Sequence, residues 1–223
     1  MARAKAEILL RVTDLSRSYG ALMALDGFDL TVRAGECVAI MGANGSGKTT
    51  AAELISGLLQ PTSGRVEVCG RSIHLEPEAV ETRKNLAYVP DNPRLYDDLT
   101  VADHLRLVAA VHGVEENDSE ELRHRLLDRF HLAHRADFFP RQLSRGMRQK
   151  TAVACAFVRP FRVIVLDEPV VGLDAASAEA LRELLLESLA AGRAALLMTH
   201  SEEFATSVAK RTLFMEEGQL FES

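Results

Sequence analysis

Apolar and polar residues alternate along the chain in two distinct patterns. Short apolar runs between turn residues predict β-strands at 8–12, 28–32, 36–41, 64–68, 86–89, 162–166 and 194–198. Apolar residues spaced three or four apart predict helices at 48–59, over most of 100–159, and at 175–191. Two capping boxes, at 100–103 and 118–121, predict helix starts within the middle stretch.

This order of elements predicts the architecture. Strands that alternate with helices imply a mostly parallel sheet covered on both faces, so we predict an α/β fold. The 223 residues suffice for one large domain. Its core is expected at 1–92 and 160–223, with an antiparallel β region at the N-terminus, and an α-helical lobe, 93–159, is inserted. In such sheets the ligand site lies beyond the carboxyl ends of the strands.

Composition narrows the setting of this domain without changing its predicted fold. Hydrophobic residues make up 47% and charged residues 26%, as in soluble globular proteins. The formal charge of −6 argues against a nucleic-acid partner, which usually requires a basic face. No apolar run reaches the roughly 18 residues that cross a bilayer, and residues 1–8 lack the apolar core of a secretory signal. Three scattered cysteines, Cys37, Cys69 and Cys155, indicate reduced thiols and a cytosolic location.

The strongest chemical signal follows the predicted strand 36–41. It is the pattern G-x-x-x-x-G-K-[ST] with one further threonine, formed by Gly42, Ala43, Asn44, Gly45, Ser46, Gly47, Lys48, Thr49 and Thr50. Its glycines let consecutive backbone N–H groups turn toward a phosphate, and the following helix adds the partial positive charge of its N-terminus. Lys48 adds a full charge, and Thr49 offers a hydroxyl to Mg²⁺. The core is therefore predicted to be a P-loop NTPase core that binds a nucleoside triphosphate.

Two carboxylates follow the predicted strand 162–166. Adjacent residues of a strand point to opposite sides, so Asp167 and Glu168 can have different roles. Asp167 is expected to hold Mg²⁺, and Glu168 to polarise the attacking water as general base. The alternative is a solvated pair of acids at a strand end, which the phosphate loop makes far less favoured.

Two further segments can contact a phosphate. Ser144 and Gly146 stand at the start of a predicted helix, where a hydroxyl and backbone N–H groups can bind an anion; an ordinary serine cap is the alternative. His200 follows an apolar strand, where it can hydrogen-bond a γ-phosphate or the attacking water; a capping or core histidine is the alternative. Neither segment decides the function on its own.

Taken together and in this order, these segments resemble the ATP-binding cassette family, the nucleotide-binding subunits of ABC transporters. The resemblance spans essentially the whole chain. Residues 143–147, Leu-Ser-Arg-Gly-Met, are similar to the family's signature, which other phosphate-loop families lack. Residues 172–174, which end in Asp174, resemble its D-loop, and His200 resembles its switch histidine. Tyr19 is similar to the aromatic residue that stacks on adenine.

The resemblance implies that a head-to-tail dimer hydrolyses ATP with Mg²⁺. Ser144, Arg145 and Gly146 of one subunit would cap the γ-phosphate held by the other subunit's loop, so that ATP joins the subunits and hydrolysis releases them. The pair would be a homodimer or a heterodimer with a second ABC subunit. It would act at the cytosolic face of a membrane and drive a separate transmembrane permease.

Two positions depart from the family pattern. Asp91 stands where the family usually has a glutamine that touches Mg²⁺ and links to the permease; a carboxylate can still hold Mg²⁺ but cannot donate a hydrogen bond. Arg145 stands where glycine is common, and this variant is similar to exporter-type subfamilies, which favours export over import. The alternatives are a soluble ABC ATPase and a nucleotide-dependent regulator that hydrolyses ATP weakly. The transported substrate would be chosen by the permease.

Overall fold

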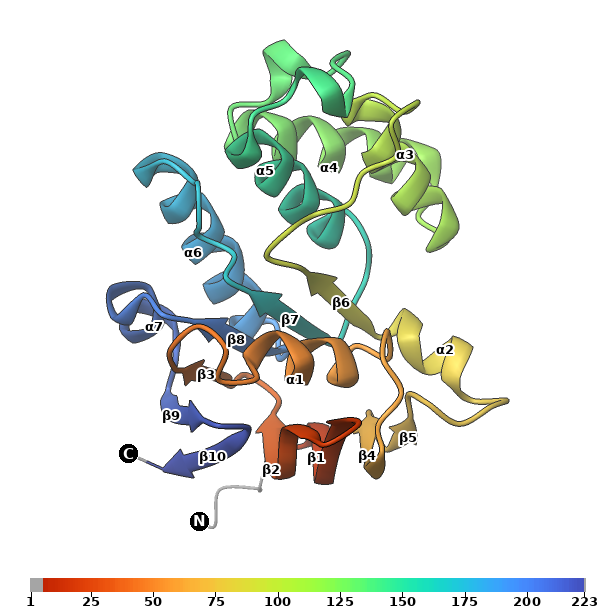
Figure 1. The fold of residues 1–223 in the computed structure, drawn as a ribbon. Helices are drawn as coiled ribbons and strands as arrows, with labels where there is room; N and C mark the ends of the chain where they lie inside the picture. The colour runs from red at the N-terminus through yellow and green to blue at the C-terminus, as the bar shows by residue number, and fades with distance from the viewer. Residues whose placement is uncertain (1–5, 223) are drawn as a thin grey trace, which may run out of the picture. The chain divides into compact units, whose positions relative to one another are not determined.

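The computed structural model describes residues 6–222, which fall into two compact units. Figure 1 traces the chain through its helices and strands. Among the described residues, unit 1 comprises 6–88, 161–167 and 185–222, and unit 2 comprises Val89–Pro160 and Glu168–Leu184. One helix, α6 (Ala175–Ala190), begins in unit 2 and ends in unit 1.

Unit 1 contains two β-sheets, of which sheet A is formed near the N-terminus. Its strands are β1 (Ile8–Tyr19), β2 (Leu22–Arg33), β4 (Ser63–Val68) and β5 (Arg71–Ser72). They pair in the order β2-β1-β4-β5, antiparallel throughout, which confirms the predicted antiparallel region. β1 and β2 are each 12 residues long, well beyond the predicted runs, because pairing continues through a register shift around Asp14, whose φ is 48°.

Sheet B contains the strands that lead to the predicted site. They are β3 (Cys37–Met41), β6 (Leu86–Val89), β7 (Val163–Asp167), β8 (Ala194–Thr199), β9 (Arg211–Glu216) and β10 (Gln219–Glu222). The order is β10-β9-β3-β8-β7-β6, and β9, β3, β8 and β7 pair in parallel. The mostly parallel sheet is therefore confirmed. The residues of β7 and β8 are all buried, as expected for parallel strands covered on both faces.

The hairpin of β9 and β10 is absent from the predicted strands. Its turn is Glu217-Gly218, with φ of 48° and 79°, and positive φ at both central residues is the mark of a type I′ hairpin turn. The flanking runs are short and alternate between buried and exposed positions, so they stand out less than the buried strands. A Glu-Gly pair between two such runs is the signal that reveals this hairpin.

Helix α1 (Lys48–Ile55) lies between the two sheets of unit 1 (Figure 1). Its residues Ala51 and Leu54 join one buried apolar cluster with Phe28 of sheet A and Ile40 of sheet B. The helix ends earlier than residue 59 because Gly57 adopts a left-handed conformation with φ of 74°. Two short helices, α2 (Ala79–Lys84) and α7 (Glu202–Val208), also belong to unit 1 and lie outside the predicted elements.

Three helices of unit 2 lie within the predicted lobe 93–159. Its helices α3 (Val101–Val111), α4 (Glu116–Arg129) and α5 (Arg145–Phe157) pack against one another. Two 3₁₀ turns, Ala133–Arg135 and Pro140–Gln142, connect α4 to α5. Unit 2 also takes in residues 168–184, whereas the predicted core included them.

The two predicted helix starts have different outcomes. At α3 the Thr100 hydroxyl accepts a hydrogen bond from the Asp103 amide at 3.1 Å, and the Thr100 amide donates to the Asp103 carboxylate at 3.2 Å, so this capping box is confirmed. The box at 118–121 is wrong, because α4 already begins at Glu116. Asp118 instead lies in the first turn of α4, where a negative charge is favoured by the helix dipole.

Candidate nucleotide-binding site

The predicted phosphate loop connects β3 to α1. Gly45 and Gly47 have φ of 83° and 109°, a conformation that glycine adopts readily. A Cβ at Gly47 would lie 2.8 Å from the Ala24 carbonyl oxygen, and one at Gly42 would overlap the Met215 carbonyl oxygen. No described side chain caps the start of α1, and its first turn carries no acidic residue. The loop therefore has the backbone shape and the uncapped helix start that phosphate binding requires.

Lys48 is held against this loop. Its side chain is almost fully buried, and Nζ donates to the carbonyl oxygens of Gly42 at 2.7 Å and Ala43 at 3.0 Å. Thr49 is exposed at the helix start. The Ser46 hydroxyl is buried and has no hydrogen-bond partner among the described residues, so a phosphate oxygen could satisfy it. The loop thus combines one ammonium with hydroxyl groups on a short stretch of chain.

The β9–β10 hairpin supports the phosphate loop from the other end of the sequence. The Gly218 amide donates to the Ser46 carbonyl oxygen at 2.9 Å, and the Gly218 carbonyl oxygen accepts from the Asp26 amide at 3.0 Å. A Cβ at Gly218 would lie 2.8 Å from the Ala24 carbonyl oxygen. The turn glycine therefore serves both the hairpin and the loop, and sequence reasoning misses it together with the hairpin.

The strand register brings three predicted parts of the site to one edge of sheet B. Met41, which precedes the phosphate loop, pairs with Thr199, which precedes His200. Asp167, the last residue of β7, pairs with Met198. Because these strands are parallel, their carboxyl ends meet at the same edge. Within unit 1 the loop, Asp167 and His200 therefore follow adjacent strands, and open α/β sheets place ligands at this edge.

Asp167 and Glu168 differ in conformation, but not through strand alternation as predicted. Asp167 ends β7 and is fully buried, whereas Glu168 follows the strand in a left-handed conformation, with φ of 47°. Left-handed φ is uncommon for glutamate and is often found at functional sites. Glu168 therefore does not continue the strand that Asp167 ends. His200 is exposed after β8, and the next residue, Ser201, caps α7 by accepting from the Phe204 amide at 3.3 Å.

Tyr19 lies at the end of β1 in unit 1. The residue is 47% exposed, and the Arg17 guanidinium carbon lies 4.6 Å from the ring centroid. The neighbouring Leu22 and Met23 are also exposed. An accessible aromatic face with apolar neighbours suits stacking on a flat base.

The signature residues of unit 2 form the start of α5. Ser144 caps the helix, since its hydroxyl accepts from the Met147 amide at 3.2 Å. Gly146 faces the backbone of the predicted D-loop, because a Cβ there would overlap the Gly172 carbonyl oxygen. A glycine at 146 therefore allows the two segments to approach closely.

A buried lysine ties the same helix to Asp174. The Lys150 ammonium donates to one Asp174 carboxylate oxygen at 2.5 Å, and the other oxygen accepts from the Ser177 amide at 2.9 Å. These bonds, the one from Lys150 foremost, hold the pKa of Asp174 well below its ordinary value. The Lys150 side chain is only 10% exposed. Sequence reasoning misses this pair, and the one signal for it is a lysine on the otherwise apolar side of a predicted helix.

Asp91 and Arg145, the two departures from the family pattern, form an ion pair within unit 2. The Arg145 Nη2 lies 3.0 Å from the Asp91 Oδ1, although 54 residues separate the two positions. One helical turn further along α5, the buried Gln149 donates to the Pro90 carbonyl oxygen at 3.2 Å. The role of Asp91 as a Mg²⁺ ligand stays a prediction.

The donors near the phosphate loop fit Mg²⁺ as a hard cation. The candidates in unit 1 are oxygen atoms, the Thr49 hydroxyl and the Asp167 carboxylate, which are the ligand types that Mg²⁺ prefers. No group of three or more His, Cys, Asp or Glu among residues 6–222 is arranged to hold a metal ion. A small protein ligand set suits Mg²⁺, which commonly keeps water and phosphate oxygens as its other ligands.

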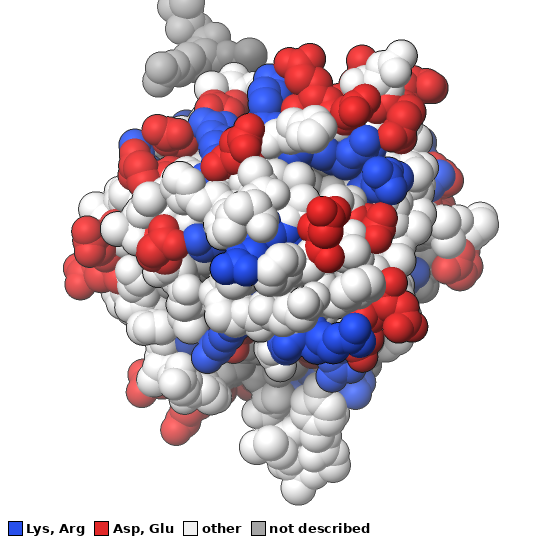
Figure 2. Space-filling view, turned by 90° about the horizontal axis from the view of Figure 1, so that it is seen from above, with Lys and Arg blue, Asp and Glu red and all other residues white. Residues whose placement is uncertain are grey.

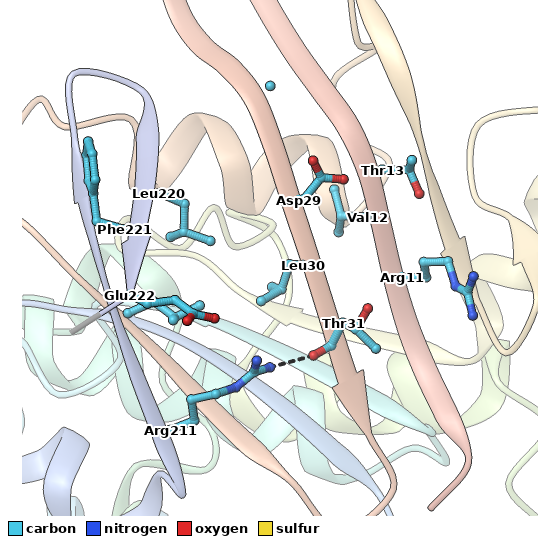
Figure 3. A pocket seen from close by; sticks show the side chains of 12 residues that line it. Arg11, Val12, Thr13, Asp29, Leu30, Thr31, Arg211, Leu220, Phe221 and Glu222 are labelled. Atoms are coloured by element: carbon cyan, nitrogen blue, oxygen red, sulfur yellow. Dashed lines mark hydrogen bonds between the residues drawn. The ribbon is translucent and has the colours of Figure 1, made fainter. Parts of the chain in front are cut away.

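A separate groove of about 550 Å³ lies in unit 1, away from these residues (Figure 3). It runs between sheet A and the β9–β10 hairpin, where Arg211 donates to the Thr31 carbonyl oxygen at 2.6 Å. Leu30 and Phe221 also line it. None of its lining residues belongs to the predicted nucleotide site.

Comparison with known proteins gives a consistent result. A family model described as ABC transporter matches residues 25–171. The SkfA peptide export ATP-binding protein SkfE of Bacillus subtilis (strain 168) is 33% identical over 214 residues, which cover 96% of this chain and 88% of the relative. Some other curated relatives are much longer, and of one of them the chain spans only 13% of the length. Among residues 6–222, no helix has the length and apolar character needed to span a membrane.

Solved structures agree with the sequence match. The structure of an ATP-binding subunit of an ABC transporter has a TM-score of 0.88 and 36% identity, covering 96% of this chain and 90% of that one. A dimeric post-hydrolysis state of an ATP-binding cassette bound to ADP and Pi has a TM-score of 0.85 and 25% identity, covering 96% and 98%. The chain therefore belongs to the ABC transporter family, as an ATP-binding and ATP-hydrolysing subunit.

Proposed function

We propose that two copies of this chain bind two ATP molecules head to tail and drive export through a separate permease at the cytosolic face of a membrane. The observation that carries the proposal is the strand register, which leads the phosphate loop, Asp167 and His200 to the same edge of sheet B. A nucleotide site at that edge has phosphate, metal and water partners on adjacent strands.

Each residue of the site has a proposed role in hydrolysis. Lys48 and the N–H groups of Gly42 to Thr50 bind the β- and γ-phosphates, and Tyr19 stacks on adenine. Thr49, Asp167 and, in the closed state, Asp91 are proposed to hold Mg²⁺. When bound, Mg²⁺ neutralises charge on the phosphate oxygens.

The reacting water is placed by Glu168 and His200. Glu168 accepts a proton from the water while the water oxygen bonds to the γ-phosphorus. The bond from that phosphorus to the bridging oxygen then breaks, and the electron pair leaves with ADP. His200 orients the water or the γ-phosphate by a hydrogen bond. Lys48 stabilises the negative charge that develops on the phosphate oxygens.

The dimer is proposed because the start of α5 is an anion site without a phosphate loop of its own. Ser144, Arg145 and Gly146 of one copy would meet the γ-phosphate held by the other copy, with Asp174 positioned beside them by Lys150. ATP has a γ-phosphate and ADP does not, so ATP would stabilise the closed pair more than ADP does. The similarity to a dimeric cassette bound to ADP and Pi supports this arrangement. A heterodimer with a second ABC subunit is the other outcome of the test below.

Export is proposed on two grounds. The relative SkfE is named for peptide export, and Arg145 in the signature is similar to exporter-type subfamilies. Reconstitution with the permease into vesicles, followed by the direction of ATP-driven movement, tests this part.

The solution mass of the Glu168→Gln protein, with and without ATP, tests the shared site. We expect a monomer without ATP and a dimer with ATP, because the substitution retains binding and slows hydrolysis on the order of 10² to 10⁴-fold. Wild-type turnover is the matched measurement. A monomer that binds ATP but never pairs contradicts the homodimer, and pairing only after addition of a second ABC subunit identifies a heterodimer.

A further inference from the structure

The ion pair between Asp91 and Arg145 joins two positions that each carry an unusual charge for the family. The two opposite charges lie 3.0 Å apart and neutralise each other. Figure 2 shows acidic and basic side chains interspersed on one face of the molecule, without a broad field of one sign. The electrostatic environment of a helix start is therefore set by the charged side chains next to it.

The start of α5 is strongly cationic apart from this carboxylate. Its first turn contains no acidic residue, and Arg145 and Arg148 both lie near its N-terminus, where the helix dipole is already positive. Basic residues at this end are unfavourable unless an anion is near. Asp91 supplies that anion from outside the helix.

The segment that carries Asp91 has one firm and one loose attachment to α5. Gln149, only 1% exposed, holds the Pro90 carbonyl oxygen and fixes the segment beside the helix. Arg145 lies four residues earlier, on the same side of the helix, and its side chain is 62% exposed, with that of Asp91 at 41%. The exposed end can therefore exchange partners while the buried end keeps the segment in place.

We propose that Asp91 is a built-in anion that holds Arg145 at the start of α5 until the γ-phosphate of ATP replaces it. A guanidinium binds carboxylate and phosphate by the same fork of N–H donors, so the two ligands compete for it. Asp91 is thus a positioning residue that sets the ATP concentration at which the two subunits close. The inference rests on the shared site proposed above.

The test is a cycle of variants in the Glu168→Gln protein, with dimer formation followed by solution mass as ATP is titrated. Asp91→Asn frees Arg145. It is expected to lower the half-point, the ATP concentration at which half of the protein is dimeric, about fivefold, which corresponds to the upper end of the free energy of an exposed ion pair. Arg145→Gln is expected to raise the half-point. In the Arg145→Gln protein, Asp91→Asn has no guanidinium to release and is expected not to lower the half-point; loss of the proposed Mg²⁺ contact can only raise it.

Two controls separate this from general charge or folding effects. Asp97→Asn removes the same charge from unit 2 but leaves the ion pair intact, so the half-point is expected to stay unchanged. Asp91→Glu keeps a carboxylate that can reach Arg145, so its half-point is expected to equal that of the parent protein. Thermal unfolding of each variant verifies that all are folded.

The outcomes are distinct. The same shift from Asp91→Asn with and without Arg145, or no shift at all, overturns the inference while leaving the shared site standing. A Glu168→Gln protein that binds ATP and stays monomeric in every variant contradicts the proposed function itself, and the inference with it.

Discussion

The starts of α1 and α5 both offer backbone N–H groups to an anion, yet they are built in different ways. At α1 the phosphate loop is continuous in sequence: positive φ at Gly45 and Gly47, an uncapped helix start, and Lys48 at its first position. At α5 a serine caps the helix, and the carboxylate that pairs with Arg145 comes from a position 54 residues away.

This difference indicates two kinds of anion site. The α1 site carries its own cation and leaves its first amides uncapped, so it can bind phosphate with a single chain. The α5 site already has a carboxylate beside its arginine, so a phosphate must compete for that place. Under the proposed function, the first is a constitutive site, which a single chain can fill, and the second depends on a partner.

Lys48→Ala is expected to have the largest effect, because α1 then loses its only full positive charge. ATP affinity should fall on the order of 100-fold, the loss expected for a charge-assisted bond to phosphate. Isothermal titration of ATP measures it. Lys84→Ala, which removes a lysine paired with Glu81 on the surface, is the control and should leave affinity unchanged. Equal affinity in the Lys48 variant would remove the basis for a constitutive site at α1.

Gly42→Ala and Gly146→Ala test the close backbone approaches at the two sites. Each new methyl would overlap a carbonyl oxygen, that of Met215 or that of Gly172, and overpacking of this kind costs about 1–3 kcal/mol of the free energy of unfolding. Urea unfolding measures the loss. Gly113→Ala is the control: its Cβ meets no atom within 4 Å, and only its φ of +72° opposes the change. A loss no larger than in this control would contradict the close approaches.

Ser144→Ala and Ser46→Ala compare the capped helix with the uncapped one. Removing the Ser144 hydroxyl leaves the Met147 amide without its cap and is expected to cost about 1 kcal/mol of unfolding free energy. Removing the Ser46 hydroxyl, which has no partner in the described part of the chain, is expected to change it by less than about 0.5 kcal/mol. Chemical unfolding without nucleotide decides between them; equal losses would show that both hydroxyls act as structural caps.

Asp174→Asn tests how the Asp174–Lys150 pair beside α5 contributes to the pH dependence of stability. The pKa of Asp174 is lowered in the folded state, so its ionised form stabilises the fold above the unfolded value, about pH 4. That stability is lost as pH falls further, toward the folded pKa. The variant should therefore show a shallower decline in unfolding free energy between pH 4 and pH 2. The difference should be small, because the Asp174 side chain is more than half exposed. If the unfolding free energy of variant and wild type depended on pH in the same way, the ionised Asp174 carboxylate would add no stability through Lys150.

Sequence alone predicts the features that depend on a few adjacent residues. The phosphate loop needs only a strand, a few glycines and a helix start, and all of these act within about ten residues. The apolar runs of β3, β7 and β8 and the box at Thr100 are local in the same way, since burial on both faces and a cap each leave a pattern in adjacent residues.

Tertiary structure decided the features that join distant segments. The β9–β10 hairpin reaches the phosphate loop through Gly218, Lys150 reaches Asp174, and Arg145 reaches Asp91. In each of these cases the partner is chosen by how strands and helices pack, and the residues around one member do not indicate which distant residue it contacts. Glu168 belongs here too, since it adopts a left-handed conformation at the turn after β7, whereas the sequence placed it beside Asp167 at the end of the strand. The motifs locate the chemistry in the chain, and the packing decides which charges meet.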